Sequence, residues 1–209
     1  MVNLILLGPP GAGKGTQARL LAEKYNLVHI ETGNILRKMA KEKSALGKKI
    51  KKWMQEGVLI PSEIVAPLVE KEIQKVLKKG KGFILDGSPR KFPENKILDE
   101  FFRKNNIKVK IIHLRVSEKE VIKRLLGRFL CSKCKKPFPS PPPEKCDVCG
   151  SKIFKRRADD NIETIRNRIE SYRRQTVPVV LDYQRRGLLI DINGEKSIEE
   201  VFKEIEMRI

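Results

Sequence analysis

The chain has 209 residues, a length typical of one large domain or of one domain with insertions. Hydrophobic residues make up 40% of it, enough for a buried core, and no run of 18 apolar residues is present to cross a membrane. The formal net charge of +19 favours anionic ligands such as nucleotides or nucleic acids, or else a solvated lysine-rich surface. The N-terminus resembles a strand rather than a signal peptide, so a cytoplasmic location is expected.

The first segments predict a strand, a glycine-rich turn and a helix. Residues 2–7 are an apolar run that only Asn3 interrupts, and helix-spaced leucines begin at residue 20. Between them lies Gly-Pro-Pro-Gly-Ala-Gly-Lys-Gly-Thr at 8–16. This order is the context of a P-loop, in which converging backbone N–H groups and a helix N-terminus bind phosphate. Lys14 adds a positive charge, and the Thr16 hydroxyl can serve the phosphate or its Mg²⁺. Gly15 departs from the general motif, which has Ser or Thr directly after the lysine.

Beyond this loop, apolar periodicity predicts strands alternating with helices. The predicted strands are 27–30, 81–86, 109–116 and 188–192, and the predicted helices are 34–43, 46–56, 63–78, 94–104, 118–126, 161–185 and 197–208. Thr32 is a candidate helix N-cap. Residues 127–160 show neither the apolar periodicity of a helix nor that of a strand, and they are predicted to be an insertion. With the first strand, the pattern predicts an α/β fold of the P-loop NTPase type, in which helices cover both faces of a parallel five-stranded sheet.

Acidic and basic side chains with a role in phosphate chemistry follow several of these elements. Asp86 ends a strongly predicted strand, at the edge where α/β folds bind ligands, and it can hold Mg²⁺ beside the P-loop. Phosphoryl transfer also needs positioned positive charge, and a guanidinium group binds phosphate oxygens in pairs. Five arginines lie near glycines or helix edges: Arg37, Arg90, Arg128, Arg157 and Arg168. Residue patterns alone do not distinguish these five from ordinary surface arginines.

All four cysteines lie in the predicted insertion. They form two Cys-x-x-Cys pairs separated by eleven residues: Cys131, Cys134, Cys146 and Cys149. Clustered cysteines in a chain expected to be cytoplasmic indicate a metal site rather than disulfides. Four thiolates suit tetrahedral Zn²⁺ and leave no open coordination position, so a structural zinc ribbon that folds the insertion is predicted. A redox-active dithiol pair is the alternative.

These segments together resemble the adenylate kinase family, in its long form with a zinc-type lid. The motifs occur in the family's order and spacing along essentially the whole chain, and the glycine before Thr16 is itself a family feature. The matching segments are GPPGAGKGTQ at 8–17, TGNILR at 32–37, DGSPR at 86–90, GR at 127–128, RADDN at 157–161 and Arg168.

The resemblance implies the reaction ATP + AMP ⇌ 2 ADP with Mg²⁺ on the ATP, in a monomer with no membrane or nucleic-acid partner. The implied catalytic residues are Lys14, Asp86, Arg90, Arg128, Arg157 and Arg168. The implied ATP site contains Gly11, Ala12, Gly13, Lys14, Gly15, Thr16, Arg128, Pro137, Phe138 and Lys196. The implied AMP site contains Thr32, Gly33, Arg37, Val58, Leu59, Ile60, Gly87, Arg90, Glu94, Arg157 and Arg168.

The resemblance also implies a division of the chain into three parts. The core would comprise residues 1–30, 61–126 and 161–209, the AMP-binding subdomain residues 31–60, and the zinc-binding lid residues 127–160. The two smaller parts would close over the substrates and exclude water, which would otherwise accept the phosphoryl group.

Three positions depart from the family's usual residues. Asn34 replaces a common Asp, Ser88 replaces an aromatic residue, and Glu94 replaces a Gln that reads the adenine edge. An ionised carboxylate only accepts hydrogen bonds, so it matches N6 of adenine but not N1, whereas guanine offers two adjacent donors. GMP, or a range of acceptors, is therefore an alternative, unless Glu94 is turned away or protonated or Asn95 reads the base. Thr32, found in AMP-specific members, favours AMP.

An alternative interpretation, outside the enzymes, is a zinc-ribbon protein that binds nucleic acid and uses the P-loop only as a scaffold. The positive charge and the four cysteines fit it. Aromatic residues, on which bases stack, are only 6% of the chain, and the insertion contains just three of them: Phe129, Phe138 and Phe154. Phosphoryl transfer accounts better for the arginines.

Overall fold

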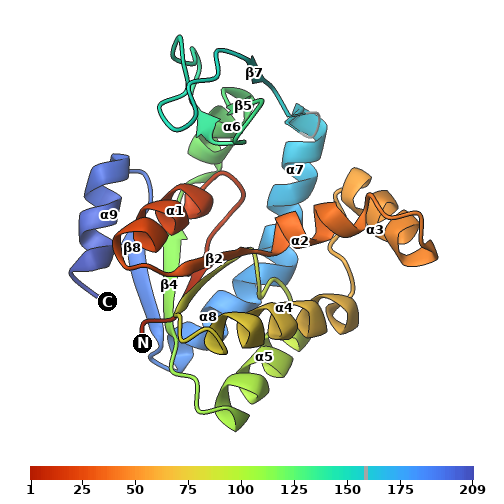
Figure 1. The fold of residues 1–209 in the computed structure, drawn as a ribbon, viewed down its shortest axis with the longest axis vertical. Helices are drawn as coiled ribbons and strands as arrows, with labels where there is room; N and C mark the ends of the chain where they lie inside the picture. Colours follow the sequence, from red (N-terminus) through yellow and green to blue (C-terminus); the bar gives the residue numbers. More distant parts are fainter. Residues whose placement is uncertain (158–159) are drawn as a thin grey trace.

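The structure is a computed structural model that describes residues 1–157 and 160–209 (Figure 1). Ala158 and Asp159, two residues of the predicted 157–161 motif, lie outside the described residues. The strands are β1 Leu4–Leu7, β2 Val28–Glu31, β3 Phe83–Asp86, β4 Lys110–Arg115, β5 Phe129–Cys131, β6 Pro137–Phe138, β7 Phe154–Lys155 and β8 Leu189–Asn193. The helices are α1 Lys14–Lys24, α2 Thr32–Met39, α3 Ala45–Gln55, α4 Ser62–Leu77, α5 Phe92–Lys104, α6 Glu118–Leu126, α7 Ile162–Ser171, α8 Val177–Arg185 and α9 Ile198–Glu206.

The main sheet has five strands in the order β2-β3-β1-β4-β8, and all of its neighbours are parallel. This confirms the predicted fold class. β1 pairs with β3 so that Leu6 lies opposite Asp86. The chain leaves both strands at the same edge, so the glycine-rich loop after β1 and the acid at the end of β3 come together there.

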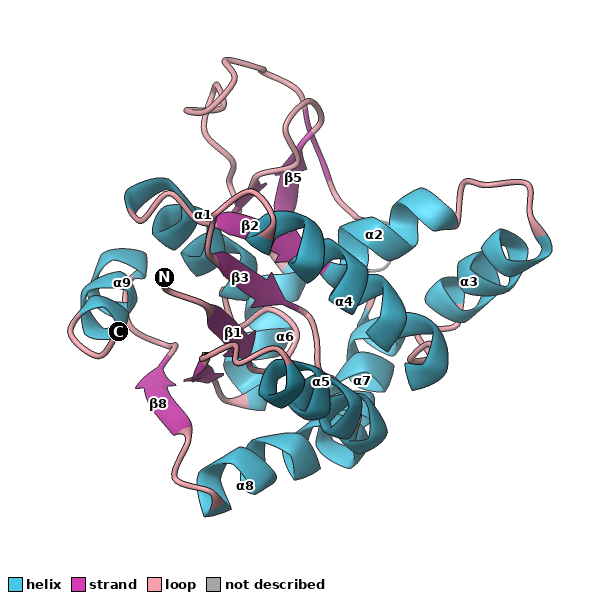
Figure 2. Cartoon of the chain, turned by 60° about the horizontal axis from the view of Figure 1, so that its bottom comes forward, coloured by secondary structure: helices cyan, strands magenta, loops and turns pink. Residues whose placement is uncertain are grey.

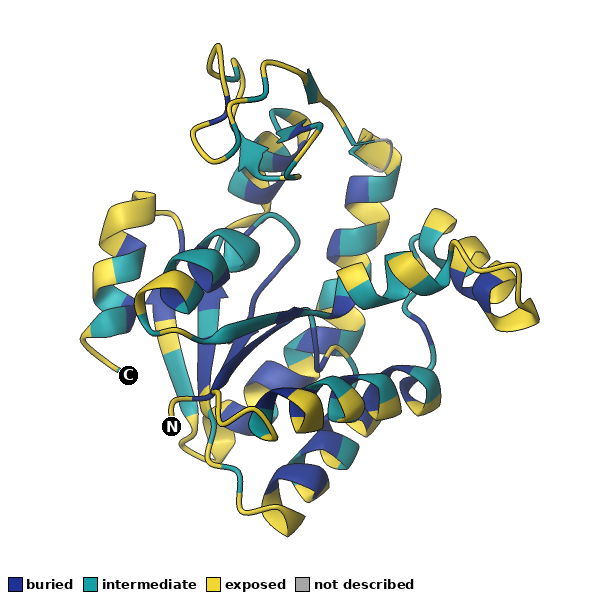
Figure 3. Cartoon of the chain, in the orientation of Figure 1, coloured by how far each residue is buried: buried dark blue, intermediate teal, exposed yellow. Residues whose placement is uncertain are grey.

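Successive residues of the central strand serve opposite faces of the sheet. Leu4 and Leu6 pack in a cluster with residues of α1 and α9, whereas Ile5 and Leu7 pack with residues of α4, α5 and α8. A strand that is buried on both faces needs apolar side chains at every position, which is why all four residues of β1 are apolar. Figure 2 shows the strands in the interior with helices around them, and the central strands β1 and β3 are buried along their whole length, as Figure 3 shows.

The predicted insertion contains regular structure that the sequence analysis missed. β5 pairs with both β6 and β7 in a small antiparallel sheet. Strands of two or three residues are too short to show a period of two. This part stands at the top of Figure 1 beyond α6, while α2 and α3 extend to the right. Both regions carry much exposed surface (Figure 3).

The prediction of one helix over 161–185 was wrong. α7 is followed by a π-helical turn, Tyr172–Thr176, and then by α8. Pro178 lacks an N–H group, and its ring crowds the carbonyl four residues earlier, at Arg174, so a regular helix cannot continue through this point. The predicted N-cap at Thr32 was also wrong, because Glu31 holds the extended N-cap conformation and Thr32 is already helical.

In the described parts of the chain, no helix combines the length and the apolar character that a membrane span requires.

Candidate active site

The glycine-rich loop curls around the N-terminus of α1. Gly13 has φ +92°, a conformation that residues with a side chain rarely adopt, and it precedes the first helical residue, Lys14. The Lys14 ammonium turns back and donates to the carbonyl oxygens of Gly8 at 2.7 Å and Pro9 at 2.8 Å. The loop therefore presents backbone N–H groups and a cation at the positive end of a helix, which is a site for phosphate.

Asp86 faces this loop from the end of β3. A Cβ atom built on Gly15 would lie 3.3 Å from Asp86 Oδ2, so the glycine between Lys14 and Thr16 leaves room for the acid. His29 on β2 was not predicted as a site residue, yet its Nε2 lies 3.4 Å from Asp86 Oδ2. Burial alone would raise the pKa of Asp86, but His29 and Lys14 together hold that pKa below its usual range. Asp86 is thus an ionised carboxylate beside the glycine-rich loop, a group of the type that can bind Mg²⁺.

Several predicted cationic residues converge on Lys14. Burial, followed by the charges of Arg90, Arg168 and Arg128, lowers the pKa of Lys14 to about 8, while Asp86 opposes this shift. These side chains come from segments that are far apart in sequence. Such a concentration of positive charge is stabilised by an anionic ligand, and polyphosphate is the ligand that the loop geometry fits.

A buried acid holds two of these arginines together. Arg128 donates to Asp160 through Nε at 2.8 Å and Nη2 at 2.6 Å, and Arg168 Nη1 lies 3.4 Å from the same carboxylate. The Asp160 side chain is only 2% exposed. Asp160 belongs to the RADDN segment at 157–161, but it was not predicted as a site residue. It fixes the end of α6 to α7 and holds both guanidinium groups in place.

A second polar group lies where β2 meets α2. Arg37 Nη2 lies 2.5 Å from Glu31 Oε1 and 2.7 Å from Asn34 Oδ1, and Asn34 Nδ2 donates to Glu31 Oε2 at 2.5 Å. The acid that the family commonly has at position 34 is thus replaced by Glu31, three residues earlier. Thr32 beside it is buried, and its hydroxyl has no hydrogen-bond partner among the described residues. A buried polar group without a partner is unusual, and a bound ligand would provide one.

The connection from α3 to α4 faces the loop that follows β3. Val58 is 51% exposed and Ile60 is buried, while the Leu59 carbonyl accepts a hydrogen bond from Lys91 Nζ at 3.0 Å. Arg90 Nε donates to the carbonyl of Gly87 at 2.8 Å. The structure therefore brings two parts of the predicted acceptor site together through Lys91, a residue that the sequence analysis did not select.

The remaining predicted donor-site residues lie in the small sheet and near α9. Pro137 and Phe138 form β6, and the Phe138 ring packs edge-on against Phe154. Lys196 forms an ion pair with Glu204 of α9 at 2.8 Å. Arg157 precedes the two undescribed residues, and its carbonyl accepts from the Asp160 amide at 3.2 Å.

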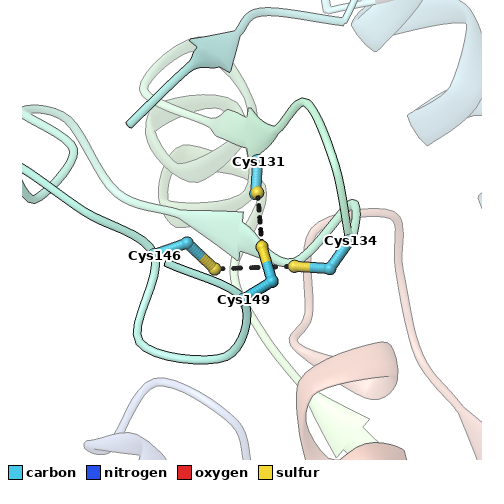
Figure 4. Close-up of side chains that lie close together, drawn as sticks. All are labelled: Cys131, Cys134, Cys146 and Cys149. Carbon is cyan, nitrogen blue, oxygen red and sulfur yellow. Dashed lines mark hydrogen bonds between the residues drawn. The ribbon is translucent and has the colours of Figure 1, made fainter. Parts of the chain in front are cut away.

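The four cysteines meet in space (Figure 4). Their Sγ atoms all lie within 4.8 Å of one another, with Cys131 to Cys149 and Cys134 to Cys146 each at 3.5 Å. None forms a disulfide. Zinc–thiolate bonds of about 2.3 Å in a tetrahedron place the sulfur atoms about 3.8 Å apart, so the cluster fits a Zn²⁺ ion. This arrangement is the one that the spacing of the two Cys-x-x-Cys pairs predicts.

Phosphoryl transfer requires a loop that can bind phosphates, positioned cations and an acid that can bind a metal ion, and this edge of the sheet has groups of all three kinds. The fold and the site therefore place the chain among the P-loop phosphotransferases. A family profile described as "Adenylate kinase" matches residues 6–188. A protein named "Adenylate kinase" from Archaeoglobus fulgidus is 43% identical over 98% of this chain and 96% of its own length. Proteins of the same name from Alkaliphilus oremlandii and Clostridioides difficile are 42% and 41% identical, over the same shares.

The chain belongs to the adenylate kinase family. The predicted resemblance is thereby confirmed, and neither the guanine-accepting alternative nor the nucleic-acid-binding alternative is favoured.

Proposed function

We propose that this chain transfers the γ-phosphoryl group of Mg-ATP reversibly to AMP, giving two molecules of ADP. The observation that carries the proposal is the convergence of Lys14, Asp86, Arg128 and Arg168 at one edge of the sheet. The names of the relatives identify the acceptor as adenylate. Positioned charge is the main contribution that a protein makes to this reaction, because the transferred group needs little covalent help.

ATP is expected to bind in the donor half of the site. Gly11, Ala12, Gly13, Lys14, Gly15 and Thr16 would hold its phosphates, with Arg128 above them and Pro137, Phe138 and Lys196 near the nucleoside. Mg²⁺ would arrive with the ATP, and Asp86 and Thr16 would bind it directly or through water. When ATP displaces the Gly8 and Pro9 carbonyls from Lys14, that ammonium gains phosphate partners instead.

AMP is expected to bind in the acceptor half. Its phosphate would meet Arg37 and Arg90, its base would lie near Thr32, Gly33, Gly87 and the backbone of Val58, Leu59 and Ile60, and Arg157 and Arg168 would bridge to the donor phosphates. The buried Thr32 hydroxyl, which has no hydrogen-bond partner among the described residues, supports a polar ligand at this point. Asp160 joins Arg168 to the lid arginine Arg128, so closure of the lid would act on both nucleotides.

The proposed division into parts follows the same roles. Residues 1–30, 61–126 and 161–209 form the core, residues 31–60 bind AMP, and residues 127–160 form a lid held by a structural Zn²⁺ on Cys131, Cys134, Cys146 and Cys149. Closure of both smaller parts would exclude water from the transferring phosphate. We further propose that the protein acts as a cytoplasmic monomer.

An acceptor panel tests the proposed reaction. The protein, with Mg²⁺ and ATP, is mixed separately with AMP, GMP, CMP and UMP, and nucleoside diphosphate formation is followed. AMP is expected to react with the highest kcat/KM. Equal or faster turnover of GMP would contradict AMP as the acceptor, and the absence of turnover with all four would contradict the kinase assignment.

Arg37 is bonded to one carboxylate, that of Glu31, and to the side-chain amide of Asn34, and this arrangement leads to a specific prediction. Asn34→Asp would place a second carboxylate beside Arg37 and the incoming phosphate, so the KM for AMP is expected to rise about 2- to 10-fold while the KM for ATP stays unchanged. The double variant Glu31→Gln/Asn34→Asp restores a single carboxylate and is expected to return the KM for AMP toward the original value. Steady-state kinetics with each substrate varied would check this; no rise in Asn34→Asp, or no recovery in the double variant, would contradict it.

A further inference from the structure

Three buried polar side chains near the acceptor half are not used by the reaction as proposed. Ser88 is fully buried, Glu94 is 3% exposed and Thr176 is 6% exposed. They come from the loop after β3, from the first turn of α5 and from the π-helical turn. Buried polar groups are costly unless they are hydrogen-bonded, so the partners of these three reveal what they do.

All three act on Arg90 or on its immediate surroundings. The Arg90 N–H donates to Glu94 Oε2 at 3.0 Å, and the Arg90 carbonyl accepts from Thr176 Oγ1 at 2.9 Å. The Ser88 hydroxyl donates to Glu94 Oε1. The Arg90 backbone is therefore held on one side from α5 and on the other from the π-helical turn, while its side-chain Nε is bonded to Gly87. We call Ser88, Glu94 and Thr176 the Arg90 frame.

The position of Glu94 in its helix explains how it reaches this backbone. It is the third residue of α5, from which an acidic side chain commonly turns back to the amides that precede a helix. Each carboxylate oxygen already accepts a hydrogen bond. Burial raises the pKa of Glu94, and the donors from Ser88 and Arg90 oppose that shift. The carboxylate thus faces protein donors rather than turning outward into the solvent.

We propose that Glu94 is a positioning residue that, with Ser88 and Thr176, sets the place of Arg90, and that its charge does not select the acceptor base. This inference rests on the proposed function in one respect, namely that Arg90 contacts the acceptor phosphate. It explains two departures from the family pattern together, since the serine in place of an aromatic residue supplies the hydrogen bond that a buried carboxylate needs.

If Glu94 positions Arg90, the substitutions Glu94→Gln and Glu94→Ala should have different effects. In Glu94→Gln, the amide oxygen can accept from the Arg90 N–H, and the amide nitrogen can donate to Ser88, whose hydroxyl also accepts. The frame is then retained. In Glu94→Ala both bonds to Glu94 are lost. Thr176→Val keeps the shape of the threonine and removes only its hydroxyl. Glu200→Ala is the matched control, because Glu200 is likewise an acid at the third residue of its helix, α9, and accepts a hydrogen bond from a backbone amide that precedes the helix.

The first readout is amide hydrogen exchange at Arg90 in the ligand-free protein, followed by NMR, which needs no turnover. Exchange at Arg90 is expected to be protected in the original protein and in Glu94→Gln, and to accelerate at least about 10-fold in Glu94→Ala. Glu200→Ala should leave it unchanged. Unprotected exchange at Arg90 in the original protein would overturn the proposal, whatever the enzyme's activity.

The second readout is kinetic. Glu94→Ala is expected to lose about 10- to 100-fold in kcat/KM for AMP, since small misplacements of a positioning group are costly, with the KM for ATP unchanged. Thr176→Val should show a smaller loss of the same kind, which keeps the test valid if Glu94→Ala does not fold. The ratio of AMP to GMP turnover should change less than about 2-fold in Glu94→Gln. A change of about 10-fold in that ratio, with Arg90 exchange still protected, would show that Glu94 reads the base and would overturn the proposal.

Discussion

Replacing Lys14 with methionine is expected to lower kcat by about 10³-fold without unfolding the protein. Lys14 is the cation nearest the phosphate loop, and the Gly8 and Pro9 carbonyls hold it there before substrate arrives. Methionine retains the length and apolar stem of the side chain but provides neither charge nor donors. The loss should fall mainly on kcat, because the charge on the transferring group is largest in the transition state.

The stability of this variant gives an independent check. The folded protein lowers the pKa of Lys14 from 10.5 to about 8, so the unfolded chain binds this proton more tightly. The contribution of Lys14 to stability therefore increases as the pH rises from about 8 to about 10.5, and at pH 7 the charged lysine opposes folding. The melting temperature of Lys14→Met should not fall below that of the original protein. Lys24→Met, at the exposed end of the same helix, is the control and should retain full activity. More than a tenth of the activity remaining in Lys14→Met would contradict the assignment of Lys14.

Loss of the metal site is expected to have the second large effect. The double variant Cys131→Ser/Cys134→Ser removes two of the four sulfur ligands, and structural zinc contributes about 10–16 kcal/mol to the folding of small zinc domains. The short strands β5, β6 and β7 have little core of their own, so this part of the chain should lose its structure. The proposed lid would then no longer close over the substrates, so kcat/KM should fall about 100-fold even though Asp160 still binds Arg128.

Two measurements together test the metal prediction. Elemental analysis should find one zinc per chain in the original protein and none in the double variant, and Ser140→Ala in the same region should keep both metal and activity. The core is expected to remain folded in the double variant, because its main apolar clusters do not draw on residues 129–155. Full activity without zinc would contradict a structural role, and reversible disulfide formation in place of metal would favour the redox alternative.

The sequence predicted the parts of the site that follow strands directly. The glycine loop after β1 and Asp86 at the end of β3 were both located from apolar runs that end at the same edge of a parallel sheet. Continuous apolar runs and glycine turns are local signals, and β1 and β3 each have both. The cysteine cluster was predictable for a similar reason, because two short spacings define it.

Residues that act through contacts distant in sequence were not predicted. Asp160 holds Arg128 across 32 residues, and Lys91 reaches Leu59 across the same span of sequence. No local pattern indicates such a partner, although an acid between two candidate phosphate-binding arginines was a usable sign for Asp160. His29 lies in an ordinary strand pattern and becomes part of the site only because β2 pairs with β3.

The hydrogen-bonding role of Glu94 also required the structure. The sequence is compatible with two orientations of the Glu94 carboxylate, one facing a bound base and one turned away from it, because the residue and its position in the helix are the same in both. The bonds to Ser88 and to the Arg90 amide distinguish them. The π-helical turn that brings Thr176 to Arg90 was predicted as regular helix, although Pro178 was a visible sign of interruption.

The most direct test of the central claim is ³¹P NMR of ATP and AMP mixed with Mg²⁺ and a catalytic amount of the protein. The account predicts that the ATP γ-phosphate and AMP signals fall together while two ADP molecules form for each ATP consumed, with no inorganic phosphate. Starting from ADP alone, the same equilibrium should be reached. Release of inorganic phosphate in place of ADP formation, or no change in either direction, would contradict the proposed phosphotransfer.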